Sequence, residues 1–178
     1  MTAHDVATFW REAGPAKWFA RDDAFDAAIR ERFFPLHESA ARGELSGWEV
    51  AAESTLALLI LLDQFPRNLF RGSAHAFATD PAARAIADRA IGRGFDQQTD
   101  APMRSFFYLP FMHSEDLADQ MRCVALYEAL GHPENLKFAV IHRDIIAQFG
   151  RFPHRNRCLG RQTTAAEQAF LDAGGFAG

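Results

Sequence analysis

The sequence has little of what marks a secreted, membrane-spanning or metal-binding protein. Cysteine occurs only twice in 178 residues, at Cys123 and Cys158, without a CxxC pair or zinc-ligand spacing. Met1 to Phe9 lacks the basic stretch followed by an apolar stretch that opens a secretory signal. The longest apolar run, Leu56 to Leu62, is far too short to span a bilayer. We therefore expect a cytoplasmic protein with two ordinary thiols and no membrane partner.

The chain also lacks a basic excess and the common cofactor motifs. Its formal net charge of −4 argues against a dedicated nucleic-acid binder. It has no phosphate-binding glycine loop, nucleophile elbow or dinucleotide fingerprint, so we predict no cofactor. Possible metal ligands, namely His113, Glu115, His142, Asp144 and His154, form no HExxH or other ligand ladder. We accordingly predict no metal site.

What the sequence does contain indicates one well-packed domain over residues 1–178. Hydrophobic residues make up 48% of the chain, and the 17 phenylalanines favour a dense interior. Charged residues account for 24%, close to the usual quarter, which argues against general disorder. A chain of this length can bury a sizeable core.

Helix start and stop signals recur along the whole chain. Thr79-Asp80-Pro81 predicts a helix start with Thr79 as the cap, and Thr164 to Glu167 reads as a capping box. Gly131 and Gly150 are placed to end helices. No alternating strand pattern of useful length occurs. We predict an all-α array of antiparallel helical hairpins, with at least half of the residues in helices.

The central core helix is predicted to run from about Trp48 to Gln64, with Ser46 as its cap. Its second half, Leu56 to Leu62, is apolar on every side. A helix without a polar face belongs in the middle of a domain.

Asp63 is the most unusual residue, because it follows this apolar run near the predicted end of the helix. The helix dipole disfavours an anion there, so the carboxylate needs a cation or several donors. Arg67 and Arg71 are the nearest candidates, and Arg151 or Arg155 could also reach it. We expect Asp63 to be buried beside an arginine, either as a structural ion pair or as part of a catalytic site.

His142 is predicted to point inward. It shares a helix face with Phe138, Ile145, Ile146 and Phe149. It is either a hydrogen-bonded core histidine or a ligand or base.

His113-Ser114-Glu115 is a further candidate site. Ser114 is predicted to cap the next helix, which places His113 before a positive helix end and favours its neutral ring. A neutral histidine beside a carboxylate can serve as a general base. The same residues could equally form a hydrogen-bonded helix start.

A basic segment follows, with no acidic residue between Asp144 and Glu167. Its candidate binding residues are Arg151, His154, Arg155, Asn156 and Arg157. Arginine forks suit carboxylates and phosphates, so the segment could bind an anion. The arginines could instead hold acidic side chains or helix ends in place.

Several of these segments resemble a bacterial family of unknown function, domain-of-unknown-function family 924. The matching segments span nearly the whole chain: Trp18-Phe19 with Asp22 and Phe25-Asp26; Leu62 to Asn68 with Phe70 to Gly72; Tyr108 to Pro110 with His113 to Glu115; His142 to Asp144; Phe149 to Asn156; Leu159 to Arg161; and Glu167 to Leu171. The resemblance implies an all-α, tetratricopeptide-like array of helical hairpins and no particular reaction.

Three functions remain open from the sequence. The first is a binding module for a peptide or small anionic ligand, and the second is an enzyme with a histidine base and arginines that stabilise negative charge. The third is a structural or interaction protein in which the signature segments only lock the fold. If the helix ends near Asp63, His113 and Arg151 converge, we expect an anion-accepting site at their solvent edge. Arg71, Arg155 and Arg157 would form it, with His113 and His154 in its lining.

Overall fold

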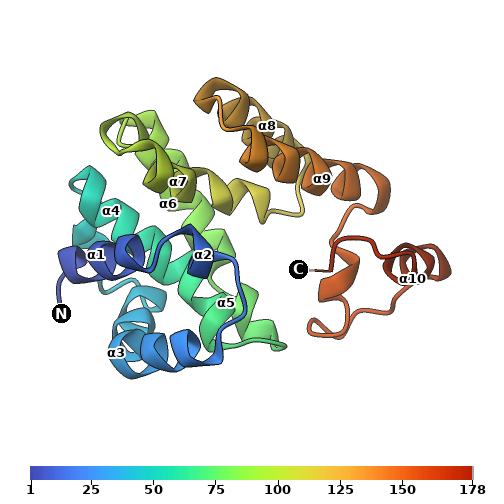
Figure 1. The fold of residues 1–178 in the computed structure, drawn as a ribbon, viewed down its shortest axis with the longest axis horizontal. Coiled ribbons are helices and arrows are strands. Elements are labelled where there is room, and N and C mark those ends of the chain that lie inside the picture. Colours follow the sequence, from blue (N-terminus) through green and yellow to red (C-terminus); the bar gives the residue numbers. More distant parts are fainter. Residues whose placement is uncertain (178) are drawn as a thin grey trace. The chain divides into compact units, whose positions relative to one another are not determined.

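The computed structural model describes residues 1–177, and these residues are helical without a strand. The helices are α1 (Ala3–Ala13), α2 (Pro15–Trp18), α3 (Asp23–Ala41), α4 (Ala52–Leu59), α5 (Phe65–Leu69), α6 (Asp80–Gly92), α7 (Ala101–Met112), α8 (Leu117–Leu130), α9 (Pro133–Phe149) and α10 (Ala165–Asp172) (Figure 1). Short 3₁₀ helices occupy Ser46–Trp48, Ala74–Phe77, Asp96–Gln98 and Pro153–Arg155, and a π-helical turn occupies Ile60–Gln64. At 73% helix, the all-α prediction is confirmed.

The contacts divide the chain into two compact units. Unit 1 comprises Met1–Arg71 and His75–Pro110, and unit 2 comprises Gly72–Ala74 and the chain from Phe111 onward. The expectation of a single domain stays a prediction. No helix in residues 1–177 combines the length and apolar character that crossing a membrane requires.

Unit 1 is built around the apolar run that the sequence singled out. Every residue from Leu56 to Leu62 is at most 2% exposed, which confirms its place in the core. Aromatic rings surround the end of this run. Phe65 packs against Phe33 and Trp10, with ring centroids 5.1 and 5.7 Å apart. Trp10 also meets Phe106 edge to face at 5.6 Å. These rings supply the large buried area that stabilises the unit.

Unit 2 contains a helical hairpin of the predicted kind. α8 and α9 lie side by side, and the connection between them is only Gly131 and His132 (Figure 1). Gly131 ends α8 in the left-handed conformation, at φ 70°, which glycine adopts without a Cβ clash. The hairpin is therefore observed, whereas the wider tetratricopeptide-like array stays a prediction.

The predicted capping box at Thr164 is confirmed, but three other helix starts differ from expectation. Ser46 does not cap the core helix, because its 3₁₀ turn ends at Trp48 and α4 begins only at Ala52. Ser114 is replaced as cap by Asp116, whose Oδ1 accepts from Ala118 N. Thr79 precedes α6 as predicted, but its side chain does not cap that helix.

The core helix also does not end at Gln64. Pro66 has no N–H, so the carbonyl of Leu62 lacks its usual helical donor. Phe65 N–H donates to Ile60 O in a π-type bond, whereas its α-helical acceptor would be Leu61 O. The chain thus passes through the π turn and continues as α5.

Side chains satisfy the carbonyls around this turn. The Thr79 hydroxyl donates to Leu62 O at 2.5 Å, and His37 Nδ1 donates to Leu61 O at 2.9 Å. Arg67 Nη1 donates to Asp63 O. Three successive carbonyls therefore accept from side chains of α3, of α5 and of the residue before α6. These bonds tie the helices together at the π turn.

Replacing Thr79 with valine should lower the free energy of unfolding by about 1–3 kcal/mol, because the buried Leu62 carbonyl loses its donor. Urea denaturation followed by circular dichroism measures the change. Thr79→Ser keeps the hydroxyl and should cost clearly less. Equal stability of the two variants would show that the hydroxyl contributes nothing.

Candidate functional site

The predicted site residues fall in both units. Asp63, Arg67 and Arg71 lie in unit 1. The other candidates, namely His113, Glu115, His142, Arg151, His154, Arg155, Asn156 and Arg157, lie in unit 2. The expected convergence of the Asp63 end with the His113 and Arg151 segments stays a prediction.

Asp63 lies within the π turn and is 1% exposed. Its Oδ2 accepts from Gln64 Nε2 at 2.6 Å, and its Oδ1 lies 3.6 Å from Arg67 Nη1. The expectation of a buried carboxylate beside an arginine is confirmed, with Arg67 as the partner.

Arg67 joins Asp63 to a second carboxylate, that of Asp80 in the first turn of α6. Its Nη1 and Nη2 donate to the two Asp80 oxygens at 3.0 Å each. Burial lowers the pKa of Arg67, but the charges of Asp63 and Asp80 outweigh it and leave that pKa raised. The guanidinium is therefore a permanent cation between two carboxylates, and it holds α5 against α6.

Arg71 is paired with an aspartate of α3. Its Nη2 donates to Asp26 Oδ1 at 2.9 Å and its Nε donates to Asp26 Oδ2. Asn68 Nδ2 adds a bond to Asp26 Oδ1 at 2.7 Å. Burial raises the pKa of Asp26, yet the bonds from Arg71 and Asn68 leave it lowered. This signature segment thus ties α5 to α3.

In unit 2, Glu115 reaches the basic segment instead of the first turn of a helix. Its carboxylate receives two bonds from Arg161, at 2.6 and 2.9 Å, and one from Phe152 N at 2.8 Å. Burial raises the pKa of Glu115, but these donors leave it lowered. Arg161 also donates to Asn156 Oδ1 at 2.9 Å.

Arg151 makes a second pair, with Glu167 of the capping box. Its Nε and Nη2 donate to the two Glu167 oxygens at 2.6 and 2.8 Å. Glu167 Oε2 also accepts from Thr164 N at 2.8 Å and from Asn156 Nδ2 at 3.2 Å. The bond from Arg151, helped by Thr164, lowers the pKa of Glu167 to about 2.

Unit 2 also contains a group of four rings, which we call the histidine–phenylalanine cluster: His142, Phe152, His154 and Phe176. The His142 ring lies 5.4 Å from that of Phe152 and 4.4 Å from that of Phe176. The His154 ring lies 5.6 and 5.5 Å from the same two rings. His142 points inward as predicted and is buried.

Both histidines of the cluster are neutral at pH 7. Burial lowers the pKa of His142 to about 3 and that of His154 to about 4. His142 Nδ1 donates to Phe138 O at 2.8 Å, because a carbonyl can only accept, so its Nε2 carries the lone pair. His113 and Arg155 lie close enough to lower both pKa values further.

Two features of the cluster point beyond simple packing. His154 Nδ1 is buried and has no hydrogen-bond partner among residues 1–177. The buried Arg155 guanidinium lies 4.6 Å from the centre of the Phe152 ring, in a cation–π contact.

Arg157, the remaining candidate of the basic segment, is exposed. Within residues 1–177, no three His, Cys, Asp or Glu side chains are arranged to hold a metal ion.

The sequence analysis identified the candidate site residues but missed the residues with which they form ion pairs. Asp26, Asp80, Arg161 and Glu167 complete the ion pairs but were not predicted as site residues. Asp26, Arg161 and Glu167 all lie in segments that carried the family resemblance, which was the available signal.

These findings define the chain as an all-α protein whose signature segments take part in two sets of partly buried ion pairs. Residues 6–175 match the family described as "Bacterial protein of unknown function (DUF924)". The chain belongs to that family, as the resemblance predicted. A solved structure of a protein of unknown function from Agrobacterium tumefaciens is similar over 96% of this chain and 97% of that one, at 54% identity and a TM-score of 0.93. No curated protein matches the chain.

Replacing Arg67 with methionine should lower the free energy of unfolding by about 3 kcal/mol, because the buried Asp63 loses its cation. Chemical denaturation measures the effect. The control is Arg89→Met, which breaks the exposed Arg89–Glu49 pair of the same unit and should cost below about 1 kcal/mol. Similar losses in both variants would contradict a special role for Arg67.

Stability should fall as the pH drops below 6.5. Above that value both cluster histidines are neutral in the folded and unfolded states. Below it the unfolded chain takes up protons that the folded chain, with pKa values of about 3 and 4, does not. Near pH 5, each histidine should contribute about 1.4 kcal/mol per pH unit to the slope of the unfolding free energy. Urea titrations from pH 5 to 6 should show one such contribution lost in His154→Gln, and an unchanged slope would refute the assignment.

Proposed function

We propose that unit 2 is a binding module for a small anionic ligand, or for an anionic group of a peptide, at the histidine–phenylalanine cluster. The observation that carries the proposal is His154 Nδ1, which is buried without a partner close to the charge of Arg155. A buried polar atom without a hydrogen bond is costly, and a ligand that provides one removes that cost.

The charge of the basic segment supports an anion. Residues between Asp144 and Glu167 include Arg151, Arg155, Arg157 and Arg161 but no acid. Glu167 pairs with Arg151 and Glu115 pairs with Arg161, and Arg157 is an exposed arginine of the same segment. A carboxylate or phosphate bound beside the cluster would meet a favourable potential.

The protonation state of the histidines favours binding over acid–base catalysis. A general base works best when its pKa lies near the working pH. With pKa values of about 3 and 4, His142 and His154 are weak proton acceptors at pH 7, but their rings can still donate and accept hydrogen bonds.

A structural role remains the second candidate for the ion pairs themselves. The Glu115–Arg161 and Arg151–Glu167 pairs each make two charge-assisted bonds inside unit 2, which suits them to hold the basic segment in place.

Thermal unfolding against phosphate, pyrophosphate, acetate, succinate and citrate at fixed ionic strength tests the binding proposal. A ligand that binds only the folded chain, at about 100 times its Kd, should raise the midpoint by roughly 5–10 °C. His154→Leu and Arg157→Ala should each reduce that rise.

The matched control is Arg143→Ala, which removes an arginine paired with Asp144 elsewhere in unit 2 and should keep the full rise. The proposal fails if no anion exceeds the effect of sodium chloride. It also fails if the rise persists in the variant that combines His154→Leu with Arg157→Ala.

A further inference from the structure

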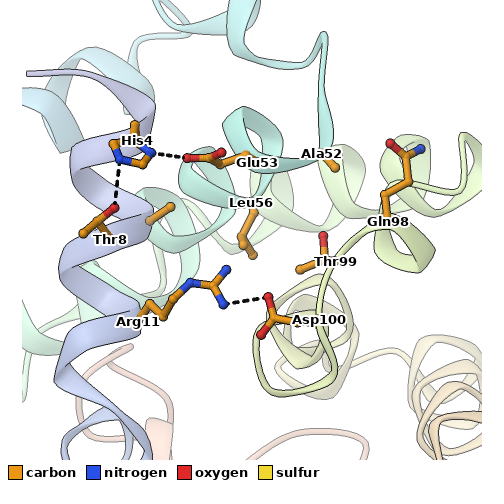
Figure 2. A pocket seen from close by; sticks show the side chains of 10 residues that line it. His4, Thr8, Arg11, Ala52, Glu53, Leu56, Gln98, Thr99 and Asp100 are labelled. Carbon is orange, nitrogen blue, oxygen red and sulfur yellow. Dashed lines mark hydrogen bonds and ion pairs between the residues drawn. The ribbon is translucent and has the colours of Figure 1, made fainter.

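Unit 1 contains a pocket that the sequence did not indicate (Figure 2). Its volume is about 310 Å³. That value lies at the lower end of the range of roughly 300–1,000 Å³ for small-molecule sites, so any occupant is small. The walls come from α1, from the first turns of α4, and from residues 98–100, which precede α7.

The pocket lies between two charged edges. His4, Ala7, Thr8 and Arg11 recur at helical spacing and so face it from one side of α1. Leu56 lies between the two edges in Figure 2. Leu56 is only 1% exposed, so the polar groups of the two edges are the main contacts that a ligand would meet.

Each charged edge is an ion pair that bridges two walls. His4 Nδ1 lies 2.7 Å from Glu53 Oε1, and Arg11 Nη1 lies 2.7 Å from Asp100 Oδ1 (Figure 2). All four side chains are about half exposed or more. Ion pairs in water contribute little free energy, so the charged groups of a ligand can compete for these partners.

We propose that this pocket binds a small zwitterion, namely a free α-amino acid. The ligand ammonium donates to the carboxylate of Glu53 at one edge of the pocket. The ligand carboxylate accepts from Arg11, whose guanidinium has five N–H donors, of which the bond to Asp100 occupies one.

The charges select against simpler ligands. Glu53 and Asp100 repel an anion that lacks an ammonium, and Arg11 repels a cation that lacks a carboxylate. This pocket therefore differs in chemistry from the cluster of unit 2, which consists of histidine and phenylalanine rings. The inference rests on unit 1 alone and does not depend on the anion proposal.

Isothermal titration calorimetry of the full chain tests the inference with the common L-amino acids, and with ethylamine and propionate as the two halves of alanine. At least one amino acid should bind with a Kd below about 10 mM. Alanine should bind at least about tenfold more tightly than either half.

Arg11→Gln and Glu53→Gln should each weaken the binding by at least about tenfold, since each removes one of the two complementary charges. The control is Arg89→Gln, which removes a half-exposed arginine of the same unit outside the pocket and should leave Kd unchanged. Circular dichroism verifies the fold of each variant. The inference is overturned if no amino acid binds, if the halves bind as tightly as alanine, or if the affinity survives both substitutions.

Discussion

Pro66 imposes the constraint on which unit 1 depends, because a proline inside a buried helical segment cannot donate to the carbonyl four residues earlier. A carbonyl left without a donor in the core would cost free energy comparable to a lost hydrogen bond. The chain responds with the π turn Ile60–Gln64 and with side-chain donors from three places. The Thr79 and His37 bonds link the turn to the start of α6 and to α3. The missing N–H of Pro66 would be a local defect in an isolated helix. In unit 1 the side chains that compensate for it connect the π turn to neighbouring helices.

The same turn explains why a charged cluster lies next to the most apolar run of the chain. Asp63 belongs to the π turn and is buried with it, so a cation has to accompany it into the interior. Arg67 serves that need and also reaches Asp80, so one guanidinium both compensates the carboxylate and joins α5 to α6. A buried ion pair of this kind adds little net stability compared with apolar packing, but breaking it is costly. Asp63 and Arg67 both lie within the family signature from Leu62 to Gly72, which therefore coincides with this pair.

Much of the fold followed from the sequence, because helix periodicity and glycine stop signals act over a few neighbouring residues. The burial of Asp63 and its pairing with Arg67 were predictable for the same reason, since the two lie one helical turn apart. The errors arose where a side chain had a choice of partners. Thr79 is a good capping residue, yet its hydroxyl bonds Leu62 because that distant carbonyl has no N–H from Pro66. Ser114 and Asp116 can both cap α8, and Glu115 between them turns toward Arg161, 46 residues away. Such choices depend on tertiary contacts, which no local pattern encodes.

In unit 2 the structural and the binding interpretations of the basic segment support each other. The Arg151–Glu167 and Glu115–Arg161 pairs hold the chain on both sides of His154 and Arg155. Because the segment has little regular secondary structure, without those pairs it would have to be ordered when a ligand arrives, at a cost in binding free energy. With them, the rings of Phe152 and the two cluster histidines are already in place. Binding sites need such a second layer of support to keep their contact groups in position. The proposed site includes residues between Arg151 and Arg161, so it requires both arginines to hold their carboxylates. The sequence presented the structural role and the binding role of the basic segment as alternatives, but the two roles are compatible.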